Sequence, residues 1–199
     1  MKTIFEITEQ KLIDEVLATV EYGVLALFAK KPYAVPVNFV YLNDVIYFHG
    51  STKGKKMDIL RENKHVSFNI NSEAAIIPSY YSSAENLACP ATTFFKSVTI
   101  DGEAEIVESR TEIVSAFTAF MEKLQPEGQY KPLDSEEYEK TFKGLSVVKI
   151  NINKLSAKFK FGQNLNKERF QLLIENLKKS GSDSDLLTLE SIRTFNKSI

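Results

Sequence analysis

Apolar residues in the first third of the chain change from helical spacing to strand spacing. Leu12, Val16 and Val20 share one helical face within residues 8–20, which predicts an amphipathic helix. After Gly23, short runs rich in Val, Ile, Phe and Tyr predict strands at 24–28, 34–41, 45–49 and 66–70. Asn and Asp at 43–44, between the second and third runs, predict a tight hairpin turn.

The longest strand pattern lies in residues 96–107. One face of this segment carries Val98, Ile100, Gly102, Ala104 and Ile106. Such strict alternation is typical of a half-buried antiparallel strand. Residues 146–152 are a further strand candidate, so six strands are expected.

Helices are predicted between the strands and after them. Residues 54–63 form a short helix in this interpretation, and Ser109 with Glu112 forms a capping box that begins a helix to about Leu124. The segments 165–179 and 184–195 are amphipathic. Because the strands come early and no βαβ alternation occurs, the chain is expected to be mainly β (α+β). The predicted architecture is a six-stranded antiparallel barrel with peripheral helices and a C-terminal helical tail.

Composition narrows the function classes. The chain has 25 basic and 26 acidic residues, so binding of nucleic acid through a large net positive charge is not expected. A single cysteine, Cys89, excludes an internal disulfide framework and fits a reducing compartment. The N-terminal segment has no sustained apolar run, so we expect neither signal peptide nor membrane anchor. A cytoplasmic location is predicted.

Residues 47–56, Tyr-Phe-His-Gly-Ser-Thr-Lys-Gly-Lys-Lys, suggest a phosphate site. A nucleotide P-loop is rejected, because His49 stands where that pattern needs glycine and Lys56 where it needs Ser or Thr. Two interpretations remain from the residues alone. Hydroxyls, glycine backbone and lysines at a helix start can bind an anion, or they can form a polar turn that solubilises the helix end.

Other candidate chemistries are weaker. Two histidines and one cysteine without ligand spacing predict no metal site. No Gly-x-Ser-x-Gly elbow supports a serine hydrolase. Cys89 fits an ordinary packed cysteine better than a reactive group near a cofactor. The irregular segment 78–93 is expected to be functional, either at the rim of the ligand site or in a dimer seam.

Three segments in order carry a resemblance to a known family. They are 34–41 with Val-Pro-Val-Asn-Phe, 46–60 with Tyr-Phe-His-Gly and Gly-Lys-Lys, and 95–102 with Ser-Val before a glycine. Together they resemble the pyridoxamine phosphate oxidase-like split barrels, in the flavin-binding branch that includes the nitroimidazole-resistance (Nim) proteins. The resemblance spans about residues 8–155. It implies a homodimer that binds FMN in grooves between the subunits.

The resemblance also implies site residues. Lys55 and Lys56 match the basic pair that holds the FMN phosphate, with Ser51 assisting. The remaining matches are Pro36, Val37 and Asn38 along the flavin ring, His49 and Gly50 at the strand end near the ring, and Ser97 on a neighbouring strand facing the cofactor. His49 is the candidate catalytic residue, as a hydrogen-bond donor or acid.

The implied function is an FMN-dependent oxidoreductase that reduces a small molecule, such as a nitro compound. The alternatives are a non-catalytic flavin- or haem-binding protein of the same fold, and a structural dimer with an empty groove. The arginines that clamp the substrate phosphate in true pyridoxamine phosphate oxidases have no clear counterpart, so vitamin B6 oxidation is not expected. The expected division is an FMN-binding domain, 1–155, and a helical extension, 156–199, packing on the barrel or on the partner subunit.

Overall fold

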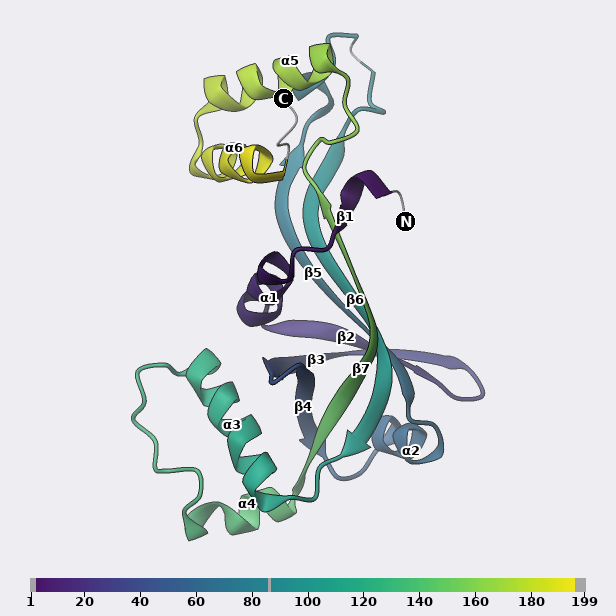
Figure 1. The fold of residues 1–199 in the computed structure, drawn as a ribbon, viewed down its shortest axis with the longest axis vertical. Coiled ribbons are helices and arrows are strands. Elements are labelled where there is room, and N and C mark those ends of the chain that lie inside the picture. The colour runs from purple at the N-terminus through teal and green to yellow at the C-terminus, as the bar shows by residue number, and fades with distance from the viewer. Residues whose placement is uncertain (1–2, 86, 196–199) are drawn as a thin grey trace. The chain divides into compact units, whose positions relative to one another are not determined.

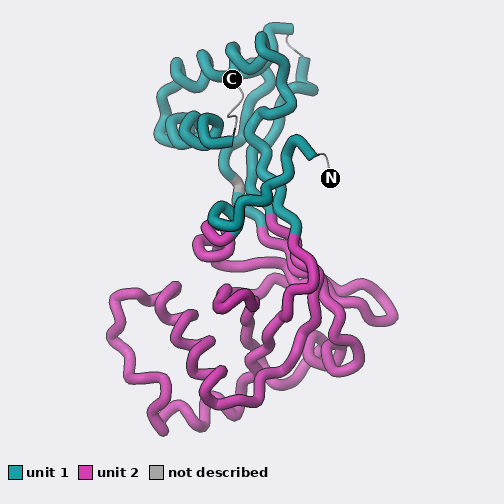
Figure 2. Tube along the Cα trace, in the orientation of Figure 1, with its two compact units in different colours: residues 1–13, 71–97, 156–199 teal, residues 14–70, 98–155 magenta. Residues whose placement is uncertain are grey.

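The computed structural model describes residues 3–85 and 87–195 (Figure 1). The chain divides into two compact units (Figure 2). Unit 1 comprises Met1–Ile13, Asn71–Ser97 and Ser156–Ile199, and unit 2 comprises Asp14–Ile70 and Val98–Leu155. The division falls within helix α1 (Gln10–Thr19) and within three long strands, β5 (His65–Ile77), β6 (Thr92–Ile106) and β7 (Leu145–Lys160).

The strands of unit 2 form the predicted antiparallel barrel. Parts of β5, β6 and β7 contribute three of its strands. The other three strands are β2 (Tyr22–Phe28), β3 (Pro32–Leu42) and β4 (Val45–Ser51). The order around the barrel is β7-β4-β3-β2-β5-β6, and pairing of β6 with β7 closes the ring of six strands. The register fits this closure, because a Cβ on Gly102 of β6 would lie 2.4 Å from the carbonyl oxygen of Asn151 on β7. A side chain at this position would therefore force the two strands apart.

The β3–β4 hairpin confirms the predicted turn. Asn43 and Asp44 have positive φ angles of 51° and 63°, as a two-residue turn that follows the twist of its strands requires. The hydroxyl of Tyr41 donates to the Asp44 carboxylate at 2.8 Å and holds the turn closed.

Alternate residues of the barrel strands form its core. Phe39, Phe48 and Phe68 are fully buried, and the Phe39 and Phe68 rings meet edge-on with centroids 5.3 Å apart. On β6 the predicted inner face is buried up to Ala104. Ile106 is 38% exposed, because the strand ends there.

The predicted helices of unit 2 are confirmed. Helix α2 spans Lys55–Glu62 and α3 spans Arg110–Leu124. The hydroxyl of Ser109 accepts the backbone N–H of Glu112 at 3.4 Å, as the capping box predicts. Helix α3 covers part of the outer wall of the barrel, where Ala116 and Phe120 pack in one buried cluster with residues of β3, β4 and β7. The short helices η3 (Glu136–Tyr138) and α4 (Glu139–Lys143) follow.

Unit 1 contains the predicted C-terminal helices, α5 (Lys167–Ser180) and α6 (Asp183–Phe195). It also contains η1 (Thr3–Phe5), η2 (Ser79–Tyr81) and β1 (Glu6–Ile7), which pairs with β7. Strand β7 continues past Ile152 to Lys160, because Ala157 and Phe159 keep the alternation of buried positions. The predicted end of this strand at Ile152 is therefore wrong. Among the described residues, no helix is both long and apolar enough to cross a bilayer.

Candidate functional site

The strand residues predicted to contact a flavin lie on both sides of the barrel wall. On β3, Pro36 and Asn38 are exposed on the outer face, whereas Val37 points into the core and is 8% exposed. On β4 the same alternation places His49 and Ser51 on the outer face. The outer face of neighbouring strands thus presents four of the predicted residues together.

An exposed, largely apolar surface includes two of these residues, Pro36 and Asn38. We call it the outer strip, and it consists of Tyr22, Val24, Phe28, Pro36 and Asn38. Tyr22 and Phe28 are 60% and 66% exposed, and Val24 is 38% exposed. The register places Tyr22 beside Asn38, and Val24 beside Pro36. Large apolar side chains gathered on one face are typical of a surface that binds a ligand or a partner.

His49 is covered on one side by helix α3. Its ring centroid lies 5.1 Å from that of Phe117 and 4.9 Å from that of Phe120. Burial lowers the pKa of His49, and the positive charge of Lys56 lowers it further. The imidazole is therefore held neutral at pH 7, with one nitrogen able to donate and the other able to accept a hydrogen bond.

The turn after β4 is rigidly built. Gly54 has a φ of 105°, a backbone conformation that residues with a Cβ atom rarely adopt. The backbone N–H of Lys53 donates to the hydroxyl of Ser51 at 3.2 Å. Arg61 of α2 donates to the carbonyl of Thr52 at 2.6 Å. These contacts fix the path of the chain into α2.

The two predicted phosphate-binding lysines point to different places. The Lys55 ammonium lies 4.2 Å from the centroid of the Tyr33 ring. Lys56 lies 5.0 Å from the centroid of Phe48, and its nitrogen is 3.0 Å from the place that a Cβ on Gly50 would take. The structure thus brings the Lys56 ammonium beside Gly50 and Phe48, because a glycine leaves space for the lysine. Burial lowers the pKa of Lys56.

The first turn of α2 supplies backbone donors at the same place. Gly54 is its N-cap residue, and within the described part of the chain no side chain caps this end. Free N–H groups at a helix N-terminus attract anions, and the adjacent lysines add positive charge. The arrangement is chemically suited to a phosphate group.

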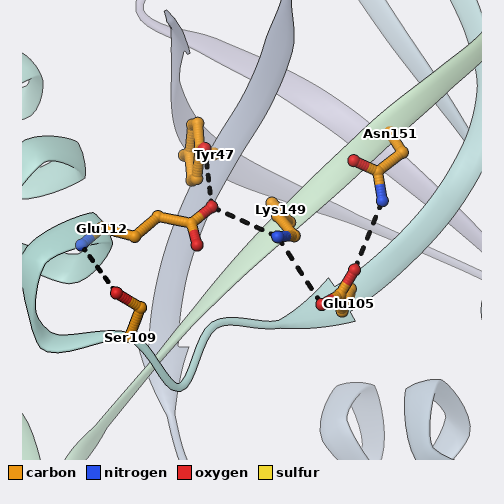
Figure 3. Close-up of polar contacts among 6 residues, drawn as sticks. All are labelled: Tyr47, Glu105, Ser109, Glu112, Lys149 and Asn151. Atoms are coloured by element: carbon orange, nitrogen blue, oxygen red, sulfur yellow. Dashed lines mark hydrogen bonds and ion pairs between the residues drawn. The ribbon is translucent and has the colours of Figure 1, made fainter.

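A polar network anchors helix α3 to the barrel (Figure 3). The Tyr47 hydroxyl donates to the Glu112 carboxylate at 2.9 Å, and Lys149 lies 3.3 Å from Glu112 and 3.6 Å from Glu105. Burial, together with the bond to Glu112, raises the pKa of Tyr47 to about 12. Since α3 covers His49, this network determines the surroundings of the predicted catalytic residue. The sequence pattern predicted the capping role of Glu112 but not its contacts with Tyr47 and Lys149.

Lys123 near the end of α3 is a second residue that sequence analysis missed. Its ammonium donates to the carbonyls of Val20 and Phe39 and lies 4.4 Å from the centroid of the Phe39 ring. Burial lowers its pKa, although the charge of Glu21 acts in the opposite direction. The spacing of Phe120 and Lys123, one helical turn apart, was the available signal that Lys123 faces the barrel.

Three predictions lie in unit 1. Ser97 is half-buried on β6, and its role toward a cofactor stays a prediction. Cys89 is exposed. Asn86 of the irregular segment 78–93 is outside the described residues, and the predicted role of this segment as a rim also stays a prediction. Across residues 3–85 and 87–195, no cluster of three or more potential metal ligands occurs.

A family model for pyridoxamine 5'-phosphate oxidase matches residues 9–159. The chain belongs to this family. The match covers the barrel and all three segments on which the sequence resemblance was based, and it confirms that resemblance. No curated protein sequence matches the chain.

Several solved structures superpose on the chain at low identity. A candidate 5-nitroimidazole antibiotic resistance protein from Bacteroides thetaiotaomicron has 20% identity and a TM-score of 0.63, covering 77% of this chain and 85% of its own. A flavocytochrome from Azotobacter vinelandii has 20% identity and a TM-score of 0.64, covering 84% and 75%. An FAD- and haem-binding protein from Mycobacterium smegmatis has 19% identity and a TM-score of 0.61, covering 77% and 72%. These similarities establish the fold.

Proposed function

We propose that this chain binds FMN against the outer face of β2, β3 and β4 and uses it to reduce a small organic molecule. The observation that carries the proposal is the outer strip, which ends beside His49 and close in sequence to a cationic helix N-terminus. A flavin needs a flat apolar surface, hydrogen bonds at the ring edge and an anion site for its phosphate. The described residues offer all three.

The phosphate site consists of Ser51, Lys56 and the first turn of α2, with Lys55 at its margin. Lys56 is half-buried, so its charge is less screened by water than that of an exposed lysine. Lys55 stacks on Tyr33 and reaches the same phosphate by a rotamer change of its flexible side chain.

The ring site consists of the outer strip and His49. Bound FMN would supply electron or hydride transfer to the substrate. Val24 and Pro36 exclude water from one side of a ring placed there. The neutral imidazole of His49 donates a hydrogen bond to the ring edge at the end of the site that α3 covers.

A second copy of the chain completes the groove in this proposal. Phe28 and Tyr22 are more than half exposed, and exposed apolar surface of this kind favours burial against a partner. We expect Phe28→Glu to shift the protein from dimer to monomer in light scattering. Leu187→Glu, at a 65% exposed position on α6, is the matched control and should leave the dimer intact. A dimer that survives Phe28→Glu would remove the outer strip from the interface.

The names of the structural neighbours support the choice of chemistry. They include a nitroimidazole resistance candidate, a flavocytochrome and an FAD- and haem-binding protein. A nitro compound is therefore the proposed electron acceptor, and a cytoplasmic location suits this role. One of these neighbours is a flavocytochrome and another binds FAD and haem. A non-catalytic flavin- or haem-binding role is therefore the second candidate function.

The test separates binding from catalysis. Purified protein is titrated with FMN, and one FMN per chain is expected at saturation. The loaded protein is then reduced without oxygen and mixed with a 5-nitroimidazole. Re-oxidation faster than that of free reduced FMN supports the oxidoreductase, and re-oxidation at the same rate or slower supports the non-catalytic binder. Failure to bind FMN contradicts both flavin proposals.

A further inference from the structure

Unit 1 contains a cavity that the proposed FMN site does not use. Its volume is about 190 Å³, and it lies among the residues around Cys89, the end of β7 and the first turns of α5. Phe94, Leu165 and Leu173 form an apolar part of its wall. Phe94 and Leu173 are buried, so this part of the wall belongs to the core of the unit.

Two cationic side chains complete the wall. Arg169 comes from the first turn of α5 and Lys160 from the last residue of β7. Among the described lining residues there is no Asp or Glu, and neither cation pairs with a carboxylate among residues 3–72, 74–85 and 87–195. The cavity therefore carries net positive charge without an internal counter-charge.

The Arg169 guanidinium is held in place by neutral groups. Its Nε donates to the Ser82 carbonyl at 2.9 Å and its Nη2 to the Ser82 hydroxyl at 3.3 Å. Ser82 is 2% exposed, so these contacts fix the guanidinium from the protein side. A guanidinium has further donors for a planar anion, and the Lys160 ammonium, which donates to the Thr92 hydroxyl, also keeps donors free.

We propose that this cavity binds a small organic carboxylate. The carboxylate accepts hydrogen bonds from Arg169 and Lys160, and an apolar body of about one ring packs against Phe94, Leu165 and Leu173. The size agrees, because an apolar cavity of about 150 Å³ holds a benzene molecule. A bare inorganic anion would leave the apolar wall in contact with water, so phosphate alone fits less well.

Cys89 provides a direct reporter of occupancy. It is the single cysteine of the chain, it is exposed, and it lines the same cavity. We expect benzoate to slow the reaction of Cys89 with a thiol reagent in a saturable way. Benzyl alcohol, which has the ring without the charge, and inorganic phosphate, which has the charge without the ring, should protect much less. Absence of protection by benzoate, or equal protection by benzyl alcohol, overturns the proposal.

Variants test the two cations separately. Lys160→Met leaves the contacts of Arg169 with Ser82 intact and should weaken benzoate binding at least about tenfold, as expected for a lost hydrogen bond between charged groups. Arg169→Gln should weaken it at least as much. Lys178→Gln, at an exposed position of α5, is the matched control and should bind as the unaltered protein does. If both Lys160→Met and Arg169→Gln bind benzoate normally, Arg169 only ties α5 to Ser82, and the carboxylate site is refuted.

Discussion

Replacing Lys56 by Met tests the FMN phosphate site most specifically. Methionine keeps most of the length and apolar contact of the side chain and removes its charge. The Lys56 ammonium lies near Gly50 and the Phe48 ring, and across the described residues no carboxylate is paired with it. Its charge is thus available for a phosphate.

The expected loss follows from one charged hydrogen bond. Such a bond contributes about 1.5–3 kcal/mol, and about 1.4 kcal/mol corresponds to a factor of ten in affinity. The dissociation constant for FMN should therefore rise about 10- to 100-fold. Riboflavin lacks the phosphate, so its dissociation constant should not change. Lys53→Met removes an exposed charge from the same turn and should leave the affinity for FMN nearly unaltered.

The stability of the variant separates binding from folding. Burial lowers the pKa of Lys56, so in the alkaline range the unfolded chain binds more protons than the folded one. Burial of the charge destabilises the fold at pH values below the lowered pKa of Lys56. This destabilisation disappears as the pH rises from the lowered pKa to the pKa of the lysine in the unfolded chain. Lys56→Met should therefore melt no lower than the unaltered protein at pH 7.

Quenching of flavin fluorescence measures both affinities. Equal losses for FMN and riboflavin would show that Lys56 acts on the ring or on the fold rather than on the phosphate. An equal loss for Lys53→Met would show that the effect is general electrostatic attraction. Either result refutes the phosphate site.

Two further substitutions and a second measurement on Lys56→Met probe the barrel and its surroundings. Tyr47→Phe should lower the free energy of unfolding by about 1.5–3 kcal/mol, measured by urea denaturation, because it removes a hydroxyl bonded to the α3 carboxylate; an unchanged midpoint contradicts a role in anchoring α3. Gly102→Ala should cost about 1–3 kcal/mol by the same measurement, because the new Cβ would meet a strand carbonyl at 2.4 Å; tolerance of alanine contradicts the closure of β6 on β7. Lys56→Met should raise the pKa of His49 in an NMR titration of the two histidines, because the lysine charge lowers that pKa; an unchanged pKa would place the two side chains apart.

The barrel could be predicted because its signals are local. Alternation along β6, the Asn43–Asp44 turn and the Ser109 cap each depend on residues close in sequence, and the structure confirms all three. The extension of β7 to Lys160 was missed, because only short alternation around Phe159 marks it. The order of strands around the ring required the structure.

The candidate site could be predicted only in part, because some of its contacts join residues far apart in the sequence. His49 contacts Phe117 and Phe120, which lie far from it in the chain, and no local sequence pattern predicts these contacts. The divergence of Lys55 and Lys56, by contrast, could have been expected. Consecutive residues of a helix point about 100° apart, so adjacent lysines at a helix start seldom share one direction.

The visible absorption spectrum of the purified protein, before and after incubation with FMN, decides whether the chain binds this flavin. We expect FMN to stay with the protein through gel filtration, to give the two flavin absorption bands and to bleach on chemical reduction. A protein that remains colourless after incubation with FMN, or that shows a haem Soret band and excludes FMN, would contradict this expectation.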